Sequence, residues 1–372
     1  MSARGATARW LVAPIIWASA FAGIGVAAGQ AGPDGARLYA RACAACHGAD
    51  GRGATPARTG LAVPLPDFTD CGYQTREPDA DWIAIAHGGG PARAFDRRMP
   101  AFGDALAEAE LAAIVRHLRT FCPDARAWPP GELNLPRAFH TEKAYPEDEA
   151  ILTVAASTDG DAIDHELIYE RRIGTRSQIE LALPVPAHRT GSGAWTGGAG
   201  DLGIAFKRSL HHDGARGRII AAAAELRLPT GRSGDGFGAG TARIEPFVSA
   251  GQLFGNAAFV QGQAGVEVPF DADRAESEVF WRVAAGTTIA QDGGRGRAWS
   301  PMIEVLAARE LEGGARIAWD VAPQLQVTLS RRQHVMLSVG VRVPVSERAG
   351  RSPAVLSYLL WDWYDGGLFT GW

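Results

Sequence analysis

From Ala150 to the end of the chain, apolar and polar residues alternate with a period of two. In residues 335–345 every second position is Val or Leu, whereas the positions between them include Met336, Ser338, Gly340 and Arg342. Successive side chains of a β-strand point to opposite faces, so this pattern predicts strands with one apolar and one polar face. The chain has 372 residues, enough for two or three domains of ordinary size. The region from Ala150 onward is expected to form an all-β domain.

Twelve such segments follow one another, and most have ten to fourteen residues. They are residues 150–157, 162–172, 176–185, 200–210, 216–228, 241–252, 257–269, 277–290, 298–309, 315–328, 333–345 and 353–363. Strands of soluble proteins usually have about five or six residues, whereas strands that cross an outer membrane at a tilt need about ten. The connections after the third and fifth segments are long and rich in Gly, and those after the second, fourth and sixth are short. Long loops on one side and tight turns on the other are typical of outer-membrane barrels.

Alternation alone does not separate a barrel from a soluble β-sandwich. A sandwich buries its apolar face, whereas an outer-membrane barrel turns that face to lipid and its polar face to the lumen. Strand length, loop asymmetry and the many Gly, Arg, Glu and Gln on the polar face favour a 12-stranded antiparallel barrel over residues 150–372. A soluble sandwich remains the alternative.

Several stretches of this region resemble one family of membrane proteins. HELIYERRIG at 165–174, QIELALPV at 178–185, GDLGIAFK at 200–207, AELRLPTG at 224–231 and VRVPV followed by LLWDW are similar to the outer-membrane transporter-like barrels associated with aromatic-degradation operons. The resemblance implies contact with outer-membrane lipid and a small-molecule solute in the lumen.

The N-terminal third carries a different signal, Cys43-Ala44-Ala45-Cys46-His47. Cys-x-x-Cys-His is the attachment pattern of a c-type haem, in which both thiols form thioether bonds and the imidazole ligates the iron. The alternatives are a redox-active Cys-x-x-Cys or half of a zinc site. Neither requires His directly after the second Cys, and no second metal-binding pair follows in the sequence.

Three helical patterns surround this motif, at residues 35–45, 79–87 and 108–121. The last is the strongest, with Leu111, Ile114, Val115 and Leu118 on one stripe. With the motif, these helices make residues 33–122 resemble a class I cytochrome c domain, which implies an all-α fold, one covalent haem c and electron transfer. We set the limits of this domain at residues 32–122.

Met99 lies between the last two predicted helices, in RRMPAFGD, where the sixth iron ligand is expected. A thioether ligand raises the reduction potential and closes the iron to exogenous ligands, as suits electron transfer. The alternative is a methionine that only fills the core.

The chain has four cysteines, and Cys71 and Cys122 remain after the haem pair is assigned. Paired thiols persist as disulfides in an oxidising compartment, so a bond between these two is expected, with two free thiols as the alternative.

Residues 1–31 predict export. Arg4 and Arg9 precede an almost wholly apolar run from Trp10 to Ala28, and small residues offer cleavage after Ala28 or Ala31. A retained N-terminal anchor is the alternative. The net charge of −4 gives no indication of nucleic-acid binding.

Residues 123–149 hold many prolines and charges without either periodicity, and predict an ordered, extended connector. We interpret Glu147 and Asp148 as solvated charges and His211 and His212 as residues of a tight turn.

The sequence shows no arrangement of residues typical of a catalytic site, so a non-enzymatic electron carrier is expected. Its partners would be periplasmic redox proteins, its haem domain would lie in the periplasm, and its barrel would lie in the outer membrane. The alternatives are an outer-membrane solute transporter with a haem-binding domain, and a soluble periplasmic subunit of a redox enzyme.

Overall fold

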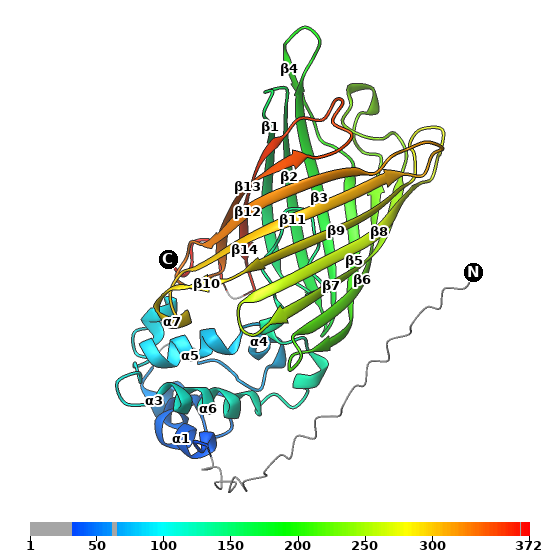
Figure 1. Ribbon diagram of the computed structural model, residues 1–372. Coiled ribbons are helices and arrows are strands. Elements are labelled where there is room, and N and C mark those ends of the chain that lie inside the picture. The colour runs from blue at the N-terminus through cyan, green and yellow to red at the C-terminus, as the bar shows by residue number, and fades with distance from the viewer. Residues whose placement is uncertain (1–31, 62–64, 365) are drawn as a thin grey trace, which may run out of the picture. The chain divides into compact units, whose positions relative to one another are not determined.

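The structure is a computed structural model that describes residues 32–61, 65–364 and 366–372. The expected export signal at residues 1–31 lies outside the described residues. The remaining chain forms a helical domain followed by a β-barrel (Figure 1).

The helical domain contains three longer helices, α1 (Gly35–Ala42), α5 (Asp79–Gly88) and α6 (Glu108–Arg119). They cover the three predicted helical ranges, although the first ends earlier than expected. Helix α6 begins where the Glu110 side chain accepts the backbone N–H of Ala107, and its apolar stripe is buried. Phe68, Trp82, Val115 and Leu118 form the core of this domain. Within the described residues, no helix has the length and apolar character needed to cross a membrane.

Short helical turns complete this part of the chain. They are α2 (Ala44–His47), α3 (Pro56–Thr59), α4 (Cys71–Gln74), η1 (Gly90–Arg93), η2 (Ala125–Ala127) and η3 (Gly131–Leu133).

Twelve long antiparallel strands follow, as predicted. They are β1 (Glu149–Ser157), β2 (Ala162–Ile173), β3 (Ser177–Arg189), β5 (Leu202–Asp213), β6 (Arg218–Leu228), β7 (Arg243–Phe254), β8 (Ala258–Pro269), β9 (Glu278–Thr287), β11 (Ala298–Glu310), β12 (Ala318–Thr328), β13 (Val335–Pro344) and β14 (Ala354–Asp362). The short strands β4 (Trp195–Gly197) and β10 (Ile289–Ala290) pair with β3 and β11.

The sheet closes on itself because β1 pairs with both β2 and β14, and β9 pairs with β11. Each of the twelve long strands thus has two neighbours, and the part of the chain that the structure describes contains no long strand with an unpaired edge.

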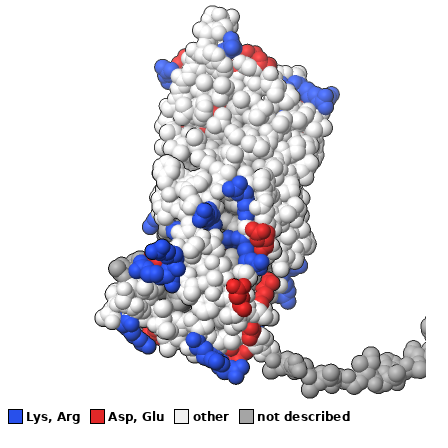
Figure 2. Space-filling model, turned by 90° about the vertical axis from the view of Figure 1, so that its left-hand side faces the viewer, with Lys and Arg blue, Asp and Glu red and all other residues white. Residues whose placement is uncertain are grey.

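The two faces of the barrel wall are inverted relative to a soluble protein. Leu167, Phe206 and Val248 are about half exposed on the outside, at 51%, 49% and 50%. The inward positions between such residues carry buried polar groups, for example Glu170 and Gln178, which are both fully buried. On the face that Figure 2 shows, a broad upper part of the barrel wall is free of charged side chains, and charges gather at the top and in the lower half of the view. This inversion excludes the β-sandwich alternative, in which the apolar face would form the core.

The connections differ between the two ends of the barrel, as expected. At the end where β1 begins, residues 174–176, 214–217 and 255–257 are short turns. The longer connection at this end contains β10 and α7 (Gln291–Gly294). At the other end, residues 190–201 include β4, and residues 229–242 include η4 (Ser233–Asp235).

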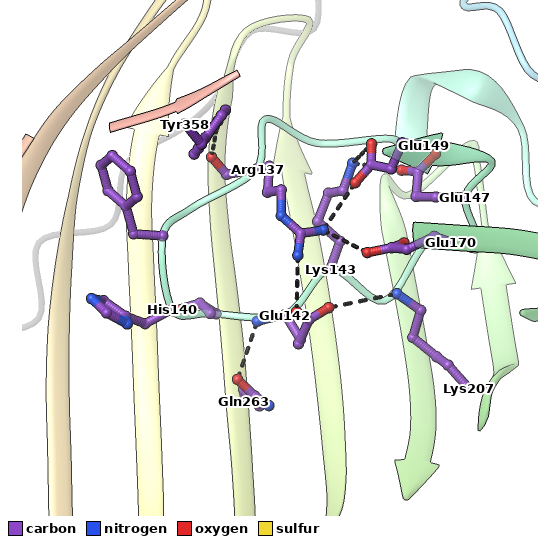
Figure 3. Close-up of polar contacts among 12 residues, drawn as sticks. Arg137, His140, Glu142, Lys143, Glu147, Glu149, Glu170, Lys207, Gln263 and Tyr358 are labelled. Atoms are coloured by element: carbon purple, nitrogen blue, oxygen red, sulfur yellow. Dashed lines mark hydrogen bonds and ion pairs between the residues drawn. The ribbon is translucent and has the colours of Figure 1, made fainter. Parts of the chain in front are cut away.

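The connector enters the barrel before β1 begins. Leu135 and Ala138 pack against Phe259, Ala284 and Met302, which belong to β8, β9 and β11. Phe139 packs on the opposite wall, with its ring 5.2 Å from that of Tyr358 on β14. We call residues 134–148 the lumen segment, because they lie among the inward faces of the strands (Figure 3).

Candidate functional site: the haem-binding turn and the lumen segment

The Cys-x-x-Cys-His stretch forms a tight helical turn. Helix α1 ends before Cys43, and Ala44–His47 make the separate turn α2. The backbone N–H of Gly53 donates to the carbonyl of His47 at 2.9 Å, and the Tyr39 hydroxyl donates to the carbonyl of Gly48 at 2.8 Å. These bonds hold the position of His47 from both sides of the turn.

The chemical groups of this turn are available for a cofactor. Cys43 is half-buried, Cys46 is exposed, and both thiols are outside any disulfide. The His47 ring stacks on Phe68 at 5.0 Å, and its Nδ1 atom is buried without a hydrogen-bond partner among the described residues. Burial lowers the pKa of His47, which favours the neutral imidazole that binds metals.

Met99 lies in the loop between η1 and α6, and glycines at the end of α5 bring this loop close. The N–H of Gly90 donates to the Met99 carbonyl at 3.0 Å. A Cβ atom on Gly89 would lie 2.8 Å from that carbonyl oxygen, and Gly89 has a φ of +75°. Only glycine suits this position without strain, so the Gly-Gly pair anchors the methionine loop.

A disulfide joins Cys71 at the start of α4 to Cys122 after α6, as expected. Beside it, the fully buried Gln74 side chain donates to the carbonyls of Phe68 and Leu118, at 3.0 and 2.6 Å. These links hold the loop that carries Phe68 against α6.

These donor groups fit a c-type haem. Two thiols outside any disulfide precede a neutral imidazole with an unsatisfied nitrogen, and a thioether lies in an anchored loop of the same domain. Cysteine thiols, an imidazole and a thioether are the types of group with which c-type cytochromes hold a haem.

The lumen segment carries buried charges that meet the barrel wall (Figure 3). The Arg137 guanidinium contacts the carboxylates of Glu149, Glu170 and Glu142, at 2.9, 2.8 and 3.2 Å. Lys143 contacts Glu147 at 2.6 Å and Glu149 at 3.3 Å. Buried charges are tolerated only when paired in this way.

Backbone groups of the segment are also satisfied by the wall. Glu304 of β11 accepts the N–H groups of Phe139, His140 and Thr141, at 3.0, 3.1 and 2.8 Å. Gln263 of β8 accepts the N–H of Glu142 at 3.1 Å. The segment is thus held by specific bonds to at least two distant strands.

Comparison with known protein families decides the nature of the helical domain. Residues 30–118 match the profile of cytochrome c oxidase, cbb3-type, subunit III. The chain carries a c-type cytochrome domain. The match spans less than a quarter of the chain, so it describes this domain and not the whole protein.

Solved structures resemble the barrel at low identity. An outer membrane channel from Pseudomonas putida F1 is 12% identical with a TM-score of 0.43, over 61% of this chain and 99% of that chain. The NanC porin is 8% identical with a TM-score of 0.42, over 57% and 98%. The KdgM porin is 7% identical with a TM-score of 0.37, again over 57% and 98%. Among curated proteins, none matches the sequence.

The cytochrome domain contacts the barrel end where β1 begins. Arg93 of η1, almost fully buried, contacts Asp81 at 2.6 Å and donates to the carbonyl of Arg295 after α7. Glu77 lies 2.7 Å from the Nε2 atom of His334 and accepts from the Tyr364 hydroxyl. The longer connection between β9 and β11 thus provides one of the contacts with the cytochrome domain.

Two carboxyl groups at this contact have shifted pKa values. Burial, reinforced by the neighbouring Glu77, raises the pKa of Asp81 to about 6. The pKa of Glu77 is lowered by His334 and Tyr364, which together outweigh its burial.

Two interpretations of the sequence were wrong. Glu147 and Asp148 are buried rather than solvated, since Glu147 pairs with Lys143 and Asp148 with Arg76. His211 and His212 belong to β5 rather than to a turn, and the His212 Nε2 atom lies 3.2 Å from the carbonyl of Arg126. The sequence did not place the connector inside the barrel. Trp128 and Phe139, two aromatic residues in an otherwise polar connector, indicated only that it packs against another part of the chain.

Proposed function

We propose that this protein is an exported electron carrier anchored in the outer membrane. Cys43 and Cys46 would hold one haem c covalently, and His47 and Met99 would ligate its iron. The observation that carries the proposal is the turn at residues 43–47, which places two thiols outside any disulfide before an imidazole whose buried Nδ1 atom lacks a partner.

The bound haem would supply reversible one-electron exchange between Fe(III) and Fe(II). The residues of the domain would set the conditions of that exchange. The low pKa of His47 keeps its imidazole neutral and able to ligate. Met99, held through Gly89 and Gly90, would supply a second protein ligand to the iron, which suits electron transfer to redox proteins rather than binding of oxygen or peroxide.

The barrel would place this domain at the outer membrane. Its outward-facing apolar side chains are suited to contact with lipid. Its closed sheet pairs the backbone N–H and C=O groups internally, as is necessary in the hydrocarbon core of a membrane. With residues 1–31 as an export signal, residues 32–122 would lie in the periplasm, residues 123–149 would connect the domains, and residues 150–372 would span the membrane. The partners would be periplasmic redox proteins.

A second function, solute passage, is favoured by the polar lining of the barrel. Arg227 with Glu225 and Arg243 with Glu267 place charge pairs at inward or partly buried positions. Such a lining suits a small polar solute. The lumen segment would have to move out of the lumen for the solute to pass. Solute flux through reconstituted protein, unchanged by the haem redox state, would favour this function over electron transfer.

Substitution of the proposed sixth ligand tests the first function. Met99→Leu keeps the size of the side chain but removes the thioether, so the reduction potential should fall and the ferrous protein should bind carbon monoxide. Both properties are measured by spectroscopy on purified membranes, after a pyridine haemochrome assay has counted the haem.

Met302→Leu is the matched control, because Met302 is a buried methionine of the barrel core. It should leave the potential and the carbon monoxide response unchanged. Should Met99→Leu behave like this control, Met99 would be a packing residue and not a ligand.

A further inference from the structure

Three buried carboxylates meet where the barrel closes. Glu147 is the next-to-last residue of the lumen segment, Glu149 begins β1 and Asp362 ends β14. Each offers an oxygen atom within 4.8 Å of the others, and their exposed fractions are 3%, 1% and 8%.

The strand register places two of these carboxylates opposite each other, which lowers the stability of the sheet. Glu149 and Asp362 are direct partners in the antiparallel pairing of β1 with β14. Like charges at directly opposed positions destabilise a sheet, and here both are removed from bulk water. The pair also lies at the seam between the first and last strands, whose pairing closes the barrel.

Among the described residues, two cations form ion pairs with these carboxylates, and both are shared between several acidic groups. Lys143 forms ion pairs with both Glu147 and Glu149. Arg137 forms ion pairs with Glu149, and also with Glu170 and Glu142 outside the cluster. Asp362 has no hydrogen-bonded or ion-paired side-chain partner among the described residues, although it is more than nine-tenths buried. Three acidic groups are thus served by two shared ion-pair partners, and Asp362 receives neither of them.

A cavity of about 220 Å³ adjoins the cluster, and all three carboxylates line it. A water molecule occupies about 30 Å³ in the liquid, so the cavity has room for an ion and several waters. The unpartnered carboxylate of Asp362 faces this space.

We propose that a divalent cation, with Ca²⁺ as the best fit, binds Glu147, Glu149 and Asp362 in this cavity. The donors are all oxygen atoms, and Ca²⁺ accepts six to eight of them in flexible geometry, waters included. The ion would neutralise the opposed pair and link the lumen segment to both strands of the seam. The site is independent of the haem and of the proposed electron transfer.

The test uses the full-length, haem-loaded protein in detergent, first stripped with a chelator. Equilibrium dialysis against CaCl₂ should show about one bound Ca²⁺ per chain. The temperature at which the heat-modifiable gel band shifts should rise with CaCl₂, and NaCl at matched ionic strength should not reproduce the rise.

Asp362→Asn should weaken Ca²⁺ binding at least tenfold. In chelator it should unfold at a higher temperature than the wild type, because the opposed charges are gone. Asp273→Asn, at an exposed position between β8 and β9, is the control and should bind like the wild type.

The proposal is overturned if the wild type binds no Ca²⁺, or if Asp362→Asn binds it unchanged. An equal response to NaCl would also overturn it, because that would indicate screening alone. If Asp362→Asn fails to fold, Glu147→Gln replaces it, and the wild-type dialysis still decides the matter.

Discussion

Individual residues of the cytochrome domain are placed by short-range bonds that its sequence already indicates. Cys43, Cys46 and His47 lie within five consecutive residues, so one helical turn brings them together. The position of the Met99 backbone depends on its close approach to Gly89 and Gly90, which are about ten residues earlier in the sequence. Such local sites are predictable because few other residues decide their geometry.

Asp81 gives a pH-dependent prediction at this scale. Its pKa rises from 3.8 to about 6 on folding, since it is buried beside Glu77 and only partly compensated by Arg93. A raised carboxyl pKa stabilises the folded state at low pH, and that contribution is lost as pH rises from about 4 to 6. At 1.36 kcal/mol per pKa unit the loss is about 3 kcal/mol.

The variant Asp81→Asn cannot ionise at this position, so its stability should not show the decrease that Asp81 causes as pH rises. The free energy of unfolding of the variant, relative to wild type, should therefore increase by about 2–3 kcal/mol between pH 4 and pH 7. Denaturant titration followed by haem absorbance measures it, and Asp104→Asn, at an exposed position of the same domain, controls for the substitution. A difference that stays constant with pH would show that Asp81 does not titrate in this range.

At the scale of elements, the disulfide between α4 and the end of α6 closes a loop of 51 residues. In the chain-entropy model a loop of this length is worth about 4 kcal/mol. The double substitution Cys71→Ser and Cys122→Ser should lower the stability of the cytochrome domain by about that amount, as measured by the denaturation midpoint. The haem stain should persist, because Cys43 and Cys46 are untouched. An unchanged midpoint would contradict the prediction.

The lumen segment gives a second prediction for an element. Glu304 accepts three backbone N–H groups of residues 139–141 and the Thr141 hydroxyl at 2.8 Å. Hydrogen bonds to a charged group contribute about 1.5–3 kcal/mol each, so Glu304→Ala should release this turn. Ion conductance in planar bilayers should then rise several-fold.

The matched control for that change is Glu310→Ala, at the exposed end of the same strand β11. It should conduct like the wild type. Equal conductance of both variants would mean that the segment does not restrict the lumen.

The strands were predictable and the lumen segment was not, for the same physical reason. Alternation is a local pattern, and it indicated twelve strands close to their observed bounds. The lumen segment has no periodicity, and its partners, such as Glu170 and Glu304, lie 33 and 165 residues away from Arg137 and Phe139. Its position depends on a closed barrel, so the sequence of the segment alone does not reveal it.

At the scale of the whole molecule, a charge-rich interior and an apolar exterior define the barrel. Fully buried Glu170 and Glu304 point inward, while Leu167 and Val248 are half exposed outside. The cytochrome domain contacts one end of this barrel through Arg93 and Glu77, and Arg76 pairs with Asp148 of the lumen segment. One chain would thereby combine a haem protein with a membrane anchor.

The most direct test of this account asks whether one polypeptide holds both properties. The protein is produced in cells that mature c-type cytochromes, and outer membranes are separated from the soluble fraction. A haem-stained band is expected in the outer membrane, and its migration should change on heating. The double substitution Cys43→Ala and Cys46→Ala should abolish the haem stain. A colourless band, or a haem-stained product confined to the soluble periplasmic fraction, would contradict it.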